Sequence, residues 1–229
     1  MAGSSNDDKV KLVCEEEDEV KWTIVKSQTF STKSLYYCLT HGGVKDSLND
    51  LIWKCKIPLK VKIFLWQIFH NKLQTAVALV KRGWHGSPLC CVCHKPETVN
   101  HIIFECVFAQ YIWCCIRDAF GLKGFPVSIQ EMVSEWLPRR LGIPKRLCFT
   151  FFAGLAWFMW KNRNKMAIEK IFPTNPDAVI HAALNLLQMC IDLQKEGDKI
   201  KMMKMVQYLT SWMGKKVQHP GFCSDIVVI

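Results

Sequence analysis

The stretch "CCVCHKPETVNHIIFEC", residues 90–106, holds four cysteines and two histidines within seventeen positions. Cys90 and Cys93 form a C-x2-C pair, and His101 and Cys106 form an H-x4-C pair after a seven-residue spacer. Zinc takes four ligands in a tetrahedron, usually thiolates and imidazoles that local sequence supplies as two close pairs. This spacing therefore predicts one zinc site with Cys90, Cys93, His101 and Cys106 as its ligands.

Four protein ligands leave no open position for water or substrate, so we expect the zinc to be structural and not catalytic. An alternative interpretation is that these cysteines are small buried hydrophobes, because free cysteine is often used in that way. Cys106 supports this alternative, since it also lies on the apolar stripe of the helix expected after the cluster. Cys91 and His94 each follow a candidate ligand directly and are interpreted as bystanders.

The composition is that of a packed protein. Half of the 229 residues are hydrophobic, including nine tryptophans and thirteen phenylalanines, so the chain can bury a sizeable core. The net charge of +10 is unevenly placed: residues 1–20 carry seven acids and two lysines, against thirteen acids and 28 bases in the rest. A basic body of this kind attracts phosphates, anionic lipids or acidic proteins.

The first twenty residues do not resemble a targeting segment, because they are polar and contain the acidic run "EEEDE" at residues 15–19. We therefore expect an intracellular protein of the cytoplasm or nucleus. In that reducing environment the twelve cysteines are expected to be thiols or metal ligands and not disulfides.

Hydrophobic residues recur at helical spacing along most of the chain, which predicts a mostly α-helical, bundle-like protein with a small CCHC zinc-knuckle insertion. Cap residues predict helix starts at Ser31, Pro58, Thr75, Ser128, Pro144 and Asn175. One continuous helix is expected from Ile102 to Phe120, and glycines at 197 and 214 are expected to end the last two helices. A short strand is expected at residues 20–25.

We expect four regions along the chain. They are an acidic disordered leader (1–20), a zinc-binding domain (21–121), a C-terminal helical region (122–214) and a flexible tail (215–229). The most apolar segment, Leu147–Trp160, would reach only about 21 Å as a helix, short of the roughly 30 Å of a bilayer core. We interpret it as a buried core helix, with membrane contact as the less favoured alternative.

The order of residues resembles the zinc-binding domain found downstream of reverse transcriptase in plant LINE-type retrotransposons. The residues that carry the resemblance are Trp22, Phe30, Ser31, Ser34, Tyr36, Ile52, Trp53, Lys54, Pro58, Lys60, Val61, Lys62, Phe64, Trp66, Thr75, Lys81, Arg82, Gly83, Cys90, Cys93, Glu97, Thr98, His101, Cys106, Ile112 and Trp113. A looser similarity to the helical region that follows in plant members centres on "WKNRNK", residues 160–165.

The resemblance implies association with RNA or single-stranded nucleic acid, and the candidate contacts are Lys56, Lys60, Lys62, Lys81 and Arg82. Against this stands the interpretation that these bases are only solvated helix faces, with Trp53, Phe64 and Trp66 packed into the core. We predict no enzymatic activity, because the scattered acids form no polymerase or nuclease set. The alternative functions are a host-adopted protein-interaction or regulatory factor and, third, interference with a membrane or organelle.

Overall fold

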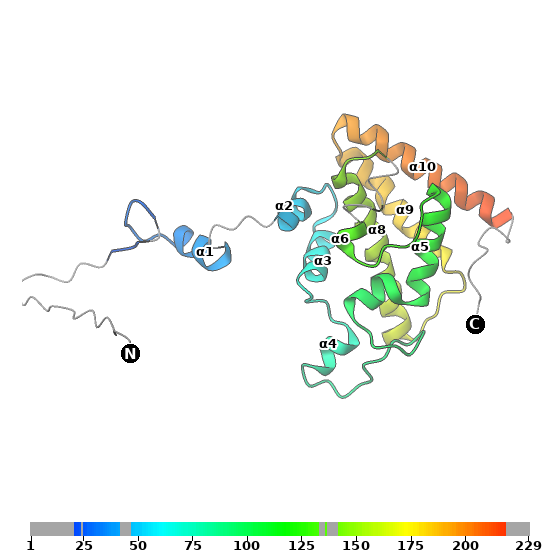
Figure 1. Ribbon diagram of the computed structural model, residues 1–229, viewed down its shortest axis with the longest axis horizontal. Coiled ribbons are helices and arrows are strands. Elements are labelled where there is room, and N and C mark those ends of the chain that lie inside the picture. Colours follow the sequence, from blue (N-terminus) through cyan, green and yellow to red (C-terminus); the bar gives the residue numbers. More distant parts are fainter. Residues whose placement is uncertain (1–20, 24, 42–46, 133–135, 137–141, 219–229) are drawn as a thin grey trace, which may run out of the picture. The chain divides into compact units, whose positions relative to one another are not determined.

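The computed structural model describes residues 21–23, 25–41, 47–132, 136 and 142–218, and it divides into two compact units, residues 1–46 and 47–229 (Figure 1). The predicted mostly helical fold is confirmed. Every regular element within these ranges is a helix, apart from one isolated antiparallel bridge between Leu89 and Pro96. The expected acidic leader (1–20) and most of the expected tail lie outside the described residues.

Unit 1 contains one described helix, α1 (Thr32–His41). Ser31 caps it as predicted, because its side chain accepts a hydrogen bond from the Ser34 amide at 3.1 Å, and Ser34 Oγ accepts one from the Ser31 amide at 3.2 Å. The strand expected at residues 20–25 is wrong in its described part. A turn closed by the Trp22 amide and the Gln28 carbonyl, 3.1 Å apart, occupies that place.

Unit 2 is built of α-helices, which Figure 1 labels, and of short π- and 3-10 helices. They are α2 (Ser47–Lys54), α3 (Leu59–Phe69), α4 (Ala76–Val80), the π-helix η1 (His101–Glu105), α5 (Val107–Phe120), α6 (Ile129–Glu131), α8 (Lys145–Asn164), the π-helix η3 (Lys165–Glu169), α9 (Asp177–Cys190), the 3-10 helix η4 (Ile191–Leu193) and α10 (Glu196–Gln218). Thr75 and Ser128 are N-caps as predicted, and α8 begins after Pro144 as expected. Pro58, expected in the first turn, is the N-cap of α3, and Pro176 is the N-cap of α9 in place of the predicted Asn175.

Helix α8 is the centre of unit 2, in contact with α3, η1 and α9. Its phenylalanines at 149, 151 and 152 are fully buried, which confirms that residues 147–160 form a core helix. Among the described helices none has the length and apolar character to span a bilayer.

Helices from before and after residue 121 contribute to one hydrophobic core. Phe64 of α3 meets Trp157 of α8 edge to face, with ring centroids 5.2 Å apart, and Phe69 stacks on Phe149 at 5.5 Å. Such aromatic pairs add stability beyond the area that they bury. The division into regions at residue 121 stays a prediction, and the structure places both regions in the same compact unit.

A buried polar cluster joins α5, α9 and α10. The Tyr111 hydroxyl donates to Asp177 Oδ1 at 2.6 Å, and Lys216 Nζ lies 2.8 Å from the same carboxylate. The side chains of Asp177 and Lys216 are only 9% and 10% exposed, so each charge depends on the other for compensation. The cluster fixes the end of α10 against the start of α9.

The last two helices end differently from the prediction. Helix α9 ends at Cys190 and continues as η4, whereas Gly197 lies in the first turn of α10. Helix α10 also runs through Gly214 to Gln218, because Met213 is fully buried and Lys216 is held by Asp177. Packing around Gly214 thus outweighs the helix-breaking tendency of that glycine.

Gly154 allows α8 and α9 to approach closely, since a β-carbon built at this position would lie 3.2 Å from Leu187 Cγ. We expect Gly154→Val to lower the free energy of unfolding by about 1–3 kcal/mol, because the added methyl groups overpack this contact. Urea unfolding followed by circular dichroism measures the change.

Gly214 provides the matched control, as it is helical and no atom outside its own helix backbone lies within 4 Å of a β-carbon built there. Gly214→Ala should raise stability by about 0.5–1 kcal/mol through helix propensity alone. A Gly154→Val protein as stable as the parent would contradict the close contact, and Leu187→Ala added to Gly154→Val should restore part of the loss.

Candidate metal centre

The side chains of Cys90, Cys93, His101 and Cys106 converge on one point. One ligand atom from each of the four residues lies within 4.8 Å of all the others. Three of these side chains are buried, and Cys93 is half-buried. No other group of three or more Cys, His, Asp or Glu side chains within the described part of the chain is placed to share a metal ion.

Two of the distances between donor atoms are close to the edges of a zinc tetrahedron. Zinc–sulfur bonds of about 2.3 Å and zinc–nitrogen bonds of about 2.0–2.1 Å imply edges of about 3.8 Å between sulfurs and about 3.6 Å between sulfur and nitrogen. Cys90 Sγ and Cys106 Sγ are 3.8 Å apart, and Cys93 Sγ and His101 Nε2 are 3.2 Å apart. The alternative, in which the cysteines are only small buried hydrophobes, does not explain why an imidazole nitrogen lies in the same group.

A tight turn positions the first two ligands. The Cys90 amide donates to the Lys95 carbonyl at 2.8 Å, and the His94 amide donates to the Cys90 carbonyl at 3.0 Å. His94 has a φ of 59°, the left-handed conformation that lets the chain reverse here. The Val92 amide points at Cys90 Sγ, 3.4 Å away, and such a bond favours the thiolate form of the sulfur.

Cys106 interrupts the helix that the sequence predicted as continuous from Ile102 to Phe120. Its φ of −62° and ψ of 139° are extended, so η1 ends before it and α5 begins after it. The Trp113 indole supports this break by donating to the Ile103 carbonyl at 2.7 Å. The extended backbone of Cys106 places its sulfur beside that of Cys90. Cys106 can therefore be buried at a position of the apolar stripe and still belong to the cluster.

The start of α5 places Cys106 beside backbone donors. As the N-cap, Cys106 lies beside unpaired backbone N–H groups at the positive end of a fourteen-residue helix. The hydrogen bond with Cys90 and burial raise the pKa of the Cys106 thiol, and the hydrogen bond from the Phe108 amide offsets only part of this rise. The hydrogen bond with Cys106 lowers the pKa of the Cys90 thiol, and binding of a metal ion by both sulfurs would release their protons.

His101 is held by contacts outside the cluster. Its backbone amide donates to Thr98 Oγ1 at 3.0 Å, as expected for a capping threonine, and its ring is 1% exposed. Nδ1 faces the Glu105 carboxylate at 3.8 Å, which leaves Nε2 directed toward Cys93. A carboxylate on the far side of a ligating imidazole fixes the ring's orientation.

Glu97 joins three segments beside the cluster, and sequence reasoning assigned it no role. Its side chain is 1% exposed and accepts two hydrogen bonds from Arg163 of α8, one of them 2.9 Å long from Arg163 Nε to Glu97 Oε2. Glu97 Oε1 also accepts from the Ala76 amide at the start of α4 at 2.8 Å. The only signal for this contact was that Glu97 and the "WKNRNK" segment both occur in the resemblance.

The two spare residues lie apart from the ligand set. Cys91 is half-buried and His94 is exposed, and neither belongs to the group of converging ligand atoms. Burial raises the pKa of the Cys91 thiol, which keeps it protonated and a poor ligand.

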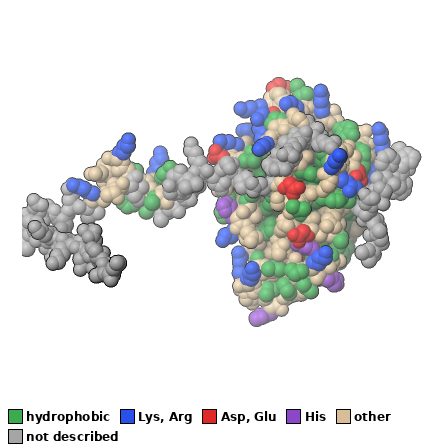
Figure 2. Space-filling model, in the orientation of Figure 1, with side chains coloured by type: hydrophobic (Ala, Val, Ile, Leu, Met, Phe, Trp, Pro, Cys, Tyr) green, Lys and Arg blue, Asp and Glu red, His purple; other side chains and the backbone are tan. Residues whose placement is uncertain are grey.

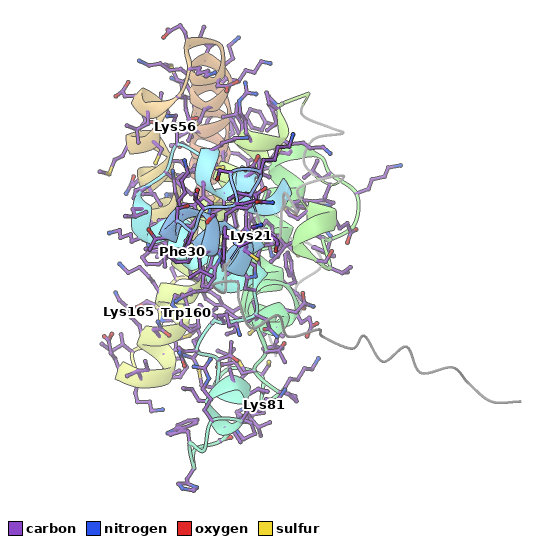
Figure 3. All side chains as sticks on the ribbon, turned by 90° about the vertical axis from the view of Figure 1, so that its left-hand side faces the viewer. Lys21, Phe30, Lys56, Lys81, Trp160 and Lys165 are labelled. Carbon is purple, nitrogen blue, oxygen red and sulfur yellow. The ribbon has the colours of Figure 1, made fainter. Side chains whose placement is uncertain are left out.

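The five basic residues predicted to contact nucleic acid do not form one patch. Lys56 precedes α3, Lys60 and Lys62 lie in its first turns, and Lys81 and Arg82 follow α4. Figure 3 shows Lys56 and Lys81 near opposite ends of unit 2, and Figure 2 shows bases scattered over several elements. All but Lys62 are exposed, and Lys62 donates to the Trp53 carbonyl at 2.9 Å.

The predicted burial of three aromatic residues is right for one of them. Phe64 is 2% exposed, but Trp53 and Trp66 are 48% and 37% exposed. The helical spacing predicts a single face packed into the core. In α3 that inward face consists of Val61, Phe64 and Leu65, whereas Leu59, Ile63 and Trp66 are exposed. Both tryptophans are therefore accessible beside lysines.

Comparison with known proteins agrees with this geometry. Residues 30–113 match the family described as zinc-binding in reverse transcriptase, and that range includes all four converging residues. Over 158 residues the chain is 29% identical to a "putative ribonuclease H protein" of Arabidopsis thaliana, a match that covers 66% of this chain and 26% of the relative. The chain thus spans about a quarter of the curated relative's length. No solved structure matches the chain significantly.

These two matches confirm the resemblance to the reverse transcriptase zinc-binding domain, and the relative's organism agrees with its plant character.

Proposed function

We propose that the reverse transcriptase-type zinc-binding domain in residues 30–113 holds one structural zinc ion and associates with RNA or single-stranded nucleic acid without catalysing a reaction. The observation that carries the proposal is the convergence of three sulfurs and one imidazole nitrogen within 4.8 Å. When bound, the ion would cross-link the knuckle turn to the start of α5. Because the four residues complete a tetrahedron, substrate would find no open position.

Surface chemistry supports a nucleic-acid partner. The chain carries a net charge of +10, and exposed tryptophans at 53 and 66 lie among exposed lysines near α3. Single strands are bound by combining a positive surface for the phosphates with aromatic side chains on which bases stack. Recognition of a particular base sequence needs a more ordered set of contacts than these exposed side chains offer. We therefore propose that the protein binds nucleic acid with little sequence preference.

We further propose that the protein acts inside the cell, in the cytoplasm or nucleus. None of the ten cysteines in the described ranges forms a disulfide, and a zinc site built on thiolates requires reduced cysteines.

A titration with a fluorescent single-stranded oligoribonucleotide tests the nucleic-acid proposal. If about three phosphates are neutralised, affinity should fall roughly tenfold or more between 50 and 200 mM salt. The logarithm of the binding constant should fall with the logarithm of the salt concentration with a slope near −0.7 per phosphate contact. The double variants Lys56→Ala/Lys60→Ala and Lys81→Ala/Arg82→Ala, which remove exposed bases and, at Arg82, one exposed hydrogen bond to Gln74, should flatten this slope. Undetectable binding at 50 mM salt, with zinc and helicity intact, would reject the proposal.

A second function, docking on a cellular protein, is favoured by the outward apolar stripe of α3. Leu59 is 64% exposed, Ile63 44% and Trp66 37%. Capture of one protein that is insensitive to salt, together with no oligonucleotide binding, would favour this function. Membrane interference through residues 147–160 has little support, because most of that segment lies in the core.

A further inference from the structure

A cavity of about 470 Å³ opens beside the cysteine cluster. Its walls come from the loop after α4, the knuckle turn, and the end of α8 with η3, and they include Trp84, His94 and Lys170. This volume falls within the range of pockets that hold a small organic molecule. Cys90 also lines the cavity, and its sulfur lies 3.8 Å from Cys106 Sγ in the cluster, so the cavity borders the metal centre.

Trp84 forms an accessible aromatic wall of this cavity. Its side chain is 49% exposed, although its backbone amide is fixed to the Leu79 carbonyl at 3.1 Å. The indole lies directly against Gly86, where any β-carbon would come within 2.0 Å of a ring atom. The loop thus holds the indole against Gly86 and leaves about half of the residue's surface exposed.

The charges around the cavity favour an anionic ligand. The acid in its wall, Glu97, is neutralised by its paired hydrogen bonds with Arg163. Lys170 is exposed, and its ammonium donates to the Ala167 carbonyl at 2.8 Å, an uncharged partner. Lys81 and Arg82 are exposed just ahead of Trp84 in the chain, and Figure 2 shows hydrophobic side chains among Lys, Arg and His at the α4 end of unit 2.

An aromatic face next to unneutralised cations matches the chemistry of a nucleotide, which has a flat base and a charged phosphate. We propose that this cavity takes one nucleotide of a single-stranded nucleic acid, with the base stacked on Trp84 and the phosphate beside Lys170. The proposal rests on the function proposed above and locates the contact at the cavity beside the zinc knuckle, whose lining does not include the exposed tryptophans of α2 and α3.

The test is a titration of the zinc-loaded full chain with a labelled twelve-nucleotide oligouridine at 50 and 200 mM salt. Trp84→Ala should weaken binding about 5- to 100-fold at both salt concentrations, because stacking is insensitive to salt. Lys170→Ala should weaken binding mainly at low salt and reduce the slope by about 0.7, as one phosphate contact is lost. Trp84→Phe, which keeps an aromatic face, should recover part of the loss.

Gly86→Ala tests the geometry without removing the ring or any charge, because the new methyl group must displace the indole. It should weaken binding in the same way as Trp84→Ala. Tyr208→Ala and Lys201→Ala are matched controls, since both residues are exposed and lie on α10, and they should bind within about twofold of the parent. Zinc content and melting temperature establish that each variant is folded.

The outcomes separate the two proposals. If the parent protein does not bind oligouridine, the proposed function fails and this site fails with it. If the parent binds while the folded variants Trp84→Ala, Gly86→Ala and Lys170→Ala bind equally well, the cavity is overturned and the nucleic-acid function stands. Selective loss in these three variants supports the cavity.

Discussion

Glu97→Gln is expected to lower the free energy of unfolding by about 3–4 kcal/mol. The substitution keeps the size of the side chain but leaves the Arg163 guanidinium, 11% exposed, without its counter-charge. Removing one partner of a buried ion pair is costly because the other charge stays desolvated. It also weakens the acceptor for the Ala76 amide, so α4 should loosen. Urea unfolding, read from circular dichroism, gives the free energy.

The control for this substitution is Asp50→Asn, which breaks an exposed ion pair. Lys54 and Asp50 are 2.8 Å apart, but their side chains are 75% and 60% exposed, so the change should cost about 0.5 kcal/mol or less. The double variant Glu97→Gln/Arg163→Gln should lose less than the sum of its single variants, since it leaves no unpaired charge. A loss below about 1 kcal/mol for Glu97→Gln would show that the pair is not structurally important.

Cys106→Ser is expected to weaken zinc binding by more than about 100-fold. Substitution of a residue that only orients a ligand typically lowers metal affinity about 10- to 100-fold, and loss of a ligand itself should lower it more. Because zinc affinity is coupled to folding, the same variant should lose stability and helix content near η1 and the start of α5. Competition against a chromophoric chelator measures the affinity, and a thermal scan measures the stability.

Cys91→Ser is the matched control, because Cys91 lies in the same turn but outside the converging atoms. It should keep zinc affinity within about threefold of the parent. Equal affinities for the Cys106→Ser and Cys91→Ser proteins would contradict the ligand assignment.

Local signals in the sequence were sufficient for most helix starts. Thr75 Oγ1 accepts from the Ala78 amide at 3.2 Å and Ser128 Oγ accepts from the Glu131 amide at 3.2 Å, so each cap acts within four residues of its own position. The four converging residues were also accessible to prediction, because all of them lie in one short segment whose spacing suits zinc.

The features that sequence reasoning missed depend on distant contacts. Glu97 and Arg163 are 66 positions apart in the sequence, and Asp177 and Lys216 are 39 positions apart. A local sequence pattern therefore could not predict either pair. The outward stripe of α3 was misassigned because an apolar helix does not reveal which face meets the core. The break at Cys106 was missed since its residues continue the helical spacing.

Metal analysis of the purified, folded protein, combined with X-ray absorption at the zinc edge, tests the central claim most directly. We predict one zinc ion per chain with three sulfur neighbours near 2.3 Å and one nitrogen neighbour near 2.0–2.1 Å. A folded, helical protein that contains no zinc after preparation with zinc present, and whose Cys90, Cys93 and Cys106 thiols react freely, would contradict the account.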